Sequence, residues 1–136
     1  MTSVEVSRFV PALPAAVERA LTPAAVVEYE GSFQVRDVDE RDGEWLVTAG
    51  RAGVELTLRF ERRGDDLYYE QQGSEGPLDR LETTLSLSPK NEGTRVTARS
   101  TVATGMPLPS VTDRIAAWKR KGELERALDA LAADLD

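Results

Sequence analysis

The sequence predicts an α+β fold in which a curved, seven-stranded antiparallel sheet wraps around a long C-terminal helix. Three observations support this prediction. Residues 32–104 alternate apolar and polar side chains between closely spaced turn signals, which is typical of an antiparallel meander. Residues 111–135 repeat apolar side chains at three- and four-residue spacing, which is typical of an amphipathic helix. Two short helical segments separate the first strand from the other six.

The N-terminal quarter contains one strand and two short helices. Alternation from Val4 to Val10 predicts the first strand, and Pro11 ends it because proline has no N–H for a ladder. Helix-forming residues follow Pro14 as far as Leu21. Thr22-Pro23 then predicts a new helix start, with a capping hydroxyl before a proline, and Gly31 is a suitable stop.

Six further strands are predicted, separated by turns rich in glycine, aspartate and asparagine. Val54 to Phe60 shows the clearest alternation, with Leu56 and Leu58 on the same face as Phe60. Turns are predicted at Asp42-Gly43, Gly50 to Gly53, Gly64 to Asp66, Gly73 to Pro77 and Asn91 to Gly93.

The last helix is predicted from Val111 to Leu135. Ser110, with Asp113 three residues later, is typical of a capped helix start. Gly122 lies inside the helix and indicates either a bend or a close approach of another element. The expected buried stripe consists of Val111, Ile115 and Trp118, continued by Leu124, Leu128, Leu131 and Leu135.

Composition excludes several kinds of chemistry. The chain contains no cysteine and no histidine, which excludes disulfides, thiol nucleophiles, the usual zinc sites and Ser-His-Asp triads. No loop has carboxylates spaced for a metal ion, so we expect neither a metal nor a cofactor. Any acid–base chemistry would depend on Asp, Glu, Tyr, Lys or Arg.

Charge narrows the range of partners. The 136 residues include 24 acidic and 17 basic side chains, for a net charge of −7, which disfavours nucleic acids and anionic membranes as partners. The preference for Arg over Lys, 14 to 3, indicates a GC-rich genome, and the acidity alternatively indicates adaptation to high salt. Without a signal peptide or an apolar run of membrane-spanning length, we expect one cytoplasmic domain over residues 1–136, with no membrane insertion. The sequence does not predict the oligomeric state.

Two segments and the order of elements resemble a known superfamily. The run Val4 to Val17 joins a first strand to a helix with an inward valine, and Leu85 to Val96 contains a Gly-Thr-Arg-Val-Thr hairpin. Together with the amphipathic last helix, these features resemble the helix-grip fold of the SRPBCC (START-like) superfamily, and most closely its polyketide cyclase/dehydrase-like branch. The resemblance covers essentially the whole chain.

The resemblance implies a cavity between the sheet and the last helix, because a curved sheet cannot follow a straight helix along its whole length. One departure from the family is the short segment Val26 to Glu30, where relatives often have a tryptophan-containing run, and this implies a narrower mouth. The residues predicted to line the cavity are Val26, Tyr29, Trp45, Val47, Leu56, Leu58, Phe60, Tyr69, Leu85, Met106, Ile115 and Trp118.

Three functions remain open from the sequence. The first is binding or carrying of a hydrophobic small molecule, lipid-like or aromatic. The second is an enzyme of the polyketide cyclase/dehydrase type, for which Tyr69 is the remaining acid candidate because Arg59 and Glu70 are predicted to point outward. The third is a protein-interaction module without a ligand. The basic run Lys119 to Lys121 is expected to be a solvated surface.

Overall fold

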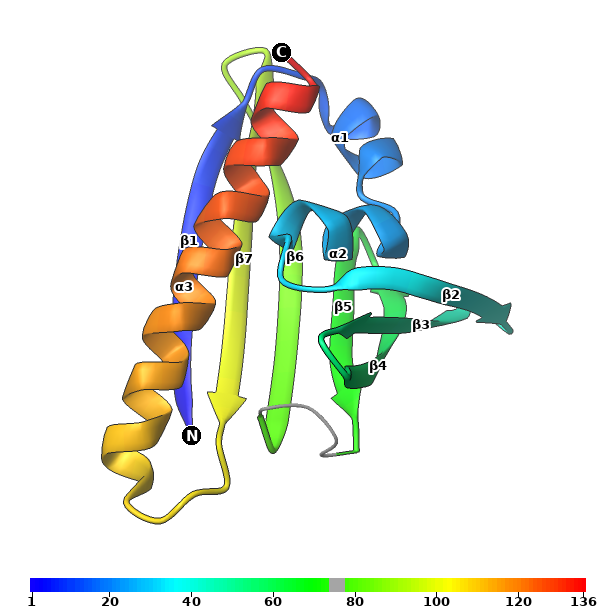
Figure 1. Cartoon of the computed structure of the whole chain (residues 1–136). Coiled ribbons are helices and arrows are strands. Elements are labelled where there is room, and N and C mark those ends of the chain that lie inside the picture. Colours follow the sequence, from blue (N-terminus) through cyan, green and yellow to red (C-terminus); the bar gives the residue numbers. More distant parts are fainter. Residues whose placement is uncertain (74–77) are drawn as a thin grey trace.

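The computed structural model describes residues 1–73 and 78–136 and contains seven strands and three helices in those ranges (Figure 1). The turn predicted over Gly73 to Pro77 falls largely on residues 74–77, which lie outside the described residues. The elements are β1 (Thr2–Val10), α1 (Pro14–Ala20), α2 (Pro23–Glu30), β2 (Gln34–Arg41), β3 (Glu44–Arg51), β4 (Val54–Arg63), β5 (Asp66–Gln72), β6 (Arg80–Lys90), β7 (Gly93–Ala103) and α3 (Pro109–Asp134).

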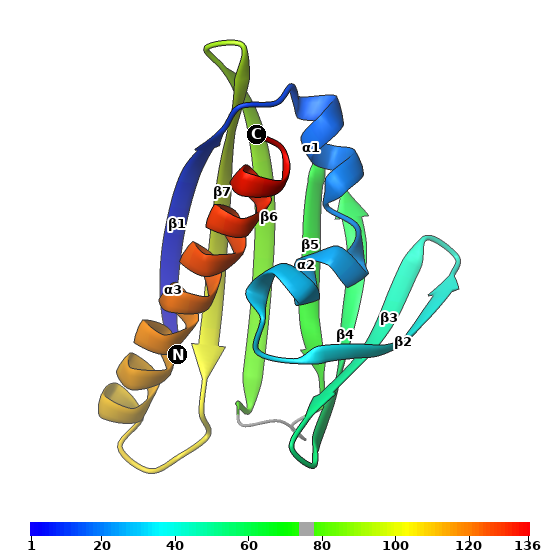
Figure 2. The same ribbon diagram turned by 45° about the horizontal axis from the view of Figure 1, so that its top comes forward.

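The seven strands form one antiparallel sheet in the order β1-β7-β6-β5-β4-β3-β2. All three helices lie on the same side of this sheet (Figures 1 and 2). Helix α3 runs along β1 and β7, and α2 lies between α3 and the β2–β3 hairpin. A register shift between Val35 and Asp37 interrupts the pairing of β2 with β3. The predicted α+β helix-grip architecture is therefore confirmed.

Local signals placed the two short helices correctly. The Thr22 hydroxyl accepts a hydrogen bond from the Ala25 N–H at 3.2 Å, which caps α2 as the sequence predicts. Gly31 ends α2 in the left-handed conformation, with φ of 77°, and its N–H bonds to the Val27 carbonyl oxygen. These caps fix where α2 begins and ends.

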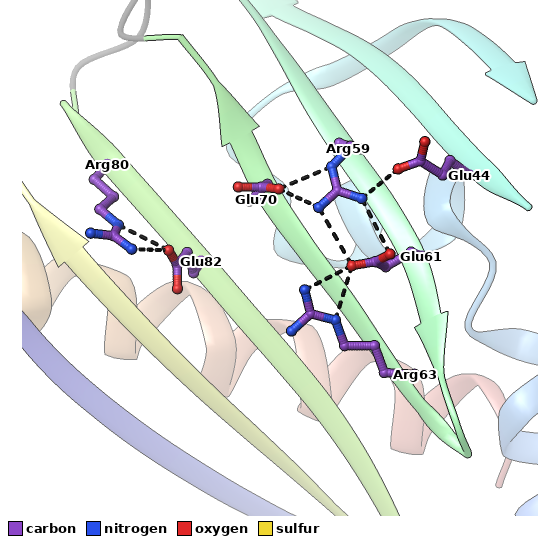
Figure 3. Close-up of polar contacts among 7 residues, drawn as sticks. All are labelled: Glu44, Arg59, Glu61, Arg63, Glu70, Arg80 and Glu82. Carbon is purple, nitrogen blue, oxygen red and sulfur yellow. Dashed lines mark hydrogen bonds and ion pairs between the residues drawn. The ribbon is translucent and has the colours of Figure 1, made fainter. Parts of the chain in front are cut away.

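The two faces of the sheet differ as alternation predicts. On β4, Leu56, Leu58 and Phe60 are buried under the helices, and the Phe60 ring stacks on Tyr69 of β5 with 4.5 Å between ring centroids. On the outer face, Arg59 bonds to Glu70 of the neighbouring strand (Figure 3). The prediction that Arg59 and Glu70 point outward as a cross-strand pair is confirmed.

The outer face carries ion pairs across four strands (Figure 3). Arg59 lies 3.3 Å from Glu61 and also contacts Glu44 of β3, while Arg63 approaches Glu61 at 2.7 Å. Arg80 pairs with Glu82 on β6. The arginines shown on this face are thus matched by carboxylates, and each exposed pair contributes about 0–1 kcal/mol.

The buried stripe of α3 differs from the predicted one. Leu124, Leu128 and Leu131 are buried, but Ile115 is 54% exposed and Trp118 is 74% exposed. Six residues of helix are about one and two-thirds turns, so Trp118 and Leu124 cannot lie on one face. The predicted stripe therefore joined two different faces, and in the N-terminal half of α3 the core-facing positions are Asp113, Ala117 and Arg120, as their burial shows.

The predicted capping arrangement of Ser110 and Asp113 is wrong. α3 begins after Leu108, whose side chain offers no cap, and the buried Asp113 carboxylate turns away from the helix start. Asp113 accepts bonds from the Met1 ammonium at 2.6 Å and from the Thr104 N–H and hydroxyl, both at 2.8 Å. These donors lower the pKa of Asp113 to about 2, the ammonium contributing most. The carboxylate ties the start of α3 to the ends of β1 and β7.

Replacing Gly122 with alanine is expected to raise the free energy of unfolding by roughly 0.5–1 kcal/mol. A Cβ at Gly122 meets no atom within 4 Å, so the added methyl group costs no contact, and helical alanine loses less backbone entropy than glycine. Urea denaturation followed by circular dichroism measures the change. Destabilisation by this substitution would show that α3 needs the flexibility of glycine at this position.

No helix in the described ranges is both long enough and apolar enough to cross a bilayer.

Candidate functional site

The twelve residues predicted to line a cavity fall into four environments. Val47, Leu56, Leu58, Phe60 and Tyr69 lie in the buried core, and Trp45 packs partly buried against it. Val26, Tyr29 and Leu85 surround a void of about 10 Å³, which is too small for an organic ligand. Met106 is exposed in the connection between β7 and α3. Ile115 and Trp118 line a larger pocket.

This larger pocket has a volume of about 1210 Å³ and lies beside residues 112–126 of α3. Its walls come from the α2–β2 connection, the β3–β4 turn, the residues just before β6 and just after β7, and α3. The apolar lining residues are Phe33, Ala52, Val54, Leu78, Ile115, Ala116 and Trp118. The curved sheet thus leaves space beside α3 at this end, whereas leucines fill the space under the C-terminal half.

A buried polar cluster borders this pocket and is centred on Arg120 of α3. The Arg120 side chain is 2% exposed. Its Nη1 donates to Glu30 Oε1 at 2.6 Å, and its Nη2 donates to Tyr69 Oη at 2.6 Å and to Thr83 Oγ1 at 2.8 Å. Its Nε donates to Ser100 Oγ at 3.1 Å. One guanidinium therefore joins α2, β5, β6 and β7 to α3.

Every member of the cluster has further partners. The Tyr69 hydroxyl donates to Glu30 Oε2, so the carboxylate accepts from both Tyr69 and Arg120. Thr83 and Ser100 share a hydroxyl–hydroxyl bond of 2.9 Å. In the described part of the chain, no buried side-chain nitrogen or oxygen lacks a hydrogen-bond partner. A charge can remain buried under such conditions, because its lost hydration is replaced.

The cluster reaches the pocket through Arg120 and Glu123, which both line it. Arg120 Nη1 lies 3.5 Å from Glu123 Oε1, and the Ser32 hydroxyl donates to the other oxygen of Glu123. Glu123 therefore closes the gap between α3 and the α2–β2 connection. Tyr69 lies behind Arg120 and Glu123 and does not line the pocket.

The electrostatics of the cluster keep its charges fixed. Burial alone would lower the pKa of Arg120, but Glu30, Tyr69 and Glu123 together outweigh burial and raise it, so the guanidinium stays charged. Burial also raises the pKa of the Tyr69 phenol, with the Arg120 charge opposing and Glu30 reinforcing the shift. Tyr69 therefore remains protonated at neutral pH and cannot serve as a base there.

Tyr29, one of the aromatic residues predicted to line the cavity, also contacts α3 through its hydroxyl group. Its hydroxyl donates to Asp134 Oδ2 at 2.6 Å, which ties α2 to the end of α3. Burial and the neighbouring Asp134 raise the pKa of Tyr29 to about 12. Arg126 adds a second tie, since its Nε donates to the Glu30 carbonyl oxygen at 3.1 Å.

The sequence reasoning missed Glu30 and Arg120. The prediction that the whole run Lys119 to Lys121 is solvated is wrong for Arg120, although Lys119 and Lys121 are exposed. One signal was available: Arg120 precedes Leu124 by four residues and therefore shares its buried face. The position of Glu30 could not be predicted from helix periodicity, because Glu30 lies 90 residues from Arg120 in the sequence.

Within residues 1–73 and 78–136, no three acidic side chains gather in a way that could hold a metal ion.

Comparison with known proteins places the chain in a family. The sequence pattern of the family described as polyketide cyclase / dehydrase and lipid transport matches residues 1–136. Among proteins of curated function, none matches the chain by sequence.

Several solved structures share the architecture. A START superfamily protein from Mycobacterium smegmatis has a TM-score of 0.75 at 12% identity, covering 98% of this chain and 96% of that one. The Zhui aromatase/cyclase from a Streptomyces species has a TM-score of 0.73 at 13% identity, covering 98% and 93%. A protein from Thermus thermophilus has a TM-score of 0.70 at 21% identity, covering 99% and 100%. At these identities the likeness shows a common fold.

Proposed function

This chain belongs to the polyketide cyclase/dehydrase and lipid transport family, and we propose that it binds a hydrophobic small molecule, lipid-like or aromatic, in the pocket beside α3. The observation that carries the proposal is the pocket itself, with about 1210 Å³ of space and an apolar wall. Concave sites of roughly 300–1,000 Å³ with mostly apolar walls are typical of small-molecule binding.

Exposed apolar side chains on α3 support the proposal. Ile115 and Trp118 lie at the pocket and expose large apolar surfaces to solvent. Burying apolar surface contributes about 25 cal/mol per Å², so a bound apolar molecule gains free energy by covering these side chains. The polar cluster around Arg120 forms a rigid border, since each of its side chains is held by others.

The catalytic alternative has less support. Tyr69, the remaining acid candidate, lies behind Arg120, and its hydroxyl is already bonded to Glu30. The interaction-module alternative requires both an exposed apolar patch and a collapsed cavity. The exposed residues at the start of α3 meet the first condition, but the volume of the pocket does not meet the second.

Titration with the neutral, apolar dye N-phenyl-1-naphthylamine tests the proposal. The dye is expected to bind the native chain with enhanced fluorescence, and Ala116→Trp, which fills the pocket, is expected to weaken binding about tenfold, or about 1.4 kcal/mol. Ala133→Trp is the matched control, because Ala133 is exposed on α3 and does not line the pocket.

Native mass spectrometry of the purified chain, followed by solvent extraction, would identify a molecule that remains bound during purification. Absence of dye binding to the native chain, or equal binding by the two alanine variants, would contradict a binding site in this pocket.

A further inference from the structure

The charge around the pocket has the opposite sign to the charge of the chain. Acidic residues outnumber basic ones overall, 24 to 17. Among the residues that line the pocket, two are acidic, Glu123 and Glu125. Five are basic: Arg51, Lys119, Arg120, Lys121 and Arg126. A concave surface with apolar walls concentrates the field of such charges and attracts ions of the opposite sign.

The basic residues differ in whether a carboxylate already neutralises them. Arg120 is paired with Glu30 and Glu123. For Arg51, Lys119 and Lys121, no carboxylate lies within 4.0 Å among the residues described. This contrasts with the outer face of the sheet, where Arg59, Arg63 and Arg80 all have partners (Figure 3).

Two cations lie on the pocket-facing side of α3, and a third comes from a different element. Lys119 and Arg126 are seven residues apart, which is two turns and about 10.5 Å along the helix. Arg126 bonds to the Glu30 carbonyl oxygen through Nε, which leaves the other donors of its guanidinium for a ligand. Arg51 belongs to β3, at the turn into β4. Cationic side chains from two elements, α3 and β3, therefore border the same pocket.

We infer that the ligand of this pocket is an anionic amphiphile, with a carboxylate or phosphate group held by Lys119, Arg126 and Arg51. Its apolar part lies against Phe33, Val54 and Ile115, which line the same pocket. The inference rests on the proposed function and adds the chemical class of the ligand. Charge-assisted hydrogen bonds are the stronger ones in proteins, so the anionic group adds to the affinity that burial of the apolar part supplies.

Isothermal titration calorimetry with four ten-carbon probes tests the inference: decanoate, decyl phosphate, decan-1-ol and decyltrimethylammonium. We expect decanoate or decyl phosphate to bind at least about tenfold more tightly than decan-1-ol, with the cation weakest. The advantage of the anion is expected to shrink between about 0.05 and 0.5 M salt, because exposed charges are screened. The ratio of the two anions distinguishes carboxylate from phosphate recognition.

Variants assign the effect to the pocket. Lys119→Gln with Arg126→Gln is expected to weaken decanoate about tenfold and to leave decan-1-ol unchanged. The control, Lys90→Gln with Arg95→Gln, removes the same charge from exposed positions on β6 and β7. If loss of the Arg126 bond to Glu30 prevents folding, Lys119→Glu alone supplies the test.

The outcomes separate the two proposals. Equal affinity for decanoate and decan-1-ol, both blocked by Ala116→Trp, would overturn the anionic class and leave the apolar site in place. Equal weakening of decanoate by both double variants would also overturn it, because the effect would then be one of net charge. Binding of none of the probes, and of no neutral dye, would overturn both proposals.

Discussion

Replacing Arg120 with methionine is expected to lower the free energy of unfolding by about 3–5 kcal/mol. The substitution keeps an unbranched side chain but leaves the Glu30 carboxylate buried without its cationic partner. It also removes hydrogen bonds to Tyr69, Thr83 and Ser100. Urea denaturation, followed by circular dichroism and by tryptophan fluorescence, measures the loss.

Two comparisons show whether the buried charge causes this effect. Lys121→Met removes an exposed cation from the next position of the helix and is expected to change stability by less than about 0.5 kcal/mol. Glu30→Gln combined with Arg120→Met leaves no charge in the cluster and is expected to be less destabilising than Arg120→Met alone. Similar effects of Arg120→Met and Lys121→Met would show that the cluster contributes little to the folded state.

Truncating Leu124 to alanine is expected to cost about 2–5 kcal/mol of stability, because the residue is 1% exposed and the truncation leaves a cavity in the core. Ile115→Ala, on the same helix, removes a similar volume from a side chain that is 54% exposed. Its expected cost is below about 0.5 kcal/mol. Denaturant unfolding of the two variants measures the difference.

Ile115→Ala is expected to affect ligand binding more than Leu124→Ala does. Ile115 lines the pocket, so Ile115→Ala should weaken binding of the neutral dye while the fold remains stable. Leu124 lies in the core under the C-terminal half of α3 and does not line the pocket. Equal destabilisation by the two variants would contradict the assignment of Ile115 to an exposed face.

Much of the fold follows from local signals in the sequence. Alternation in Val54 to Phe60 places Leu56 and Leu58 inward because strand periodicity depends only on neighbouring residues. The cap at Thr22 and the stop at Gly31 are also local, since each involves residues three or four positions away. These signals predicted the order of elements and the architecture.

The candidate site could not be predicted in the same way. Arg120 stands in a run of three basic residues, and arginine is almost never fully buried unless it is paired. Its partner Glu30 lies 90 residues away, and only the folded sheet and helices bring the two together. Predicting where the pocket lies required knowing which face of α3 meets the sheet. The predicted stripe placed Trp118 and Leu124 on one face, although the helical repeat puts them on different faces.

The irregular pairing of β2 bears on strand pairing between two copies of the chain at the edge of the sheet. β2 is an edge strand, and an unpaired edge can template aggregation by accepting a strand from another molecule. The shift between Val35 and Asp37 distorts its hydrogen-bonding groups, and Asp39, Glu40 and Arg41 place charges along it. A second chain would have to bury those charges to extend the sheet. The irregular register and the charges therefore disfavour pairing of a second chain along β2.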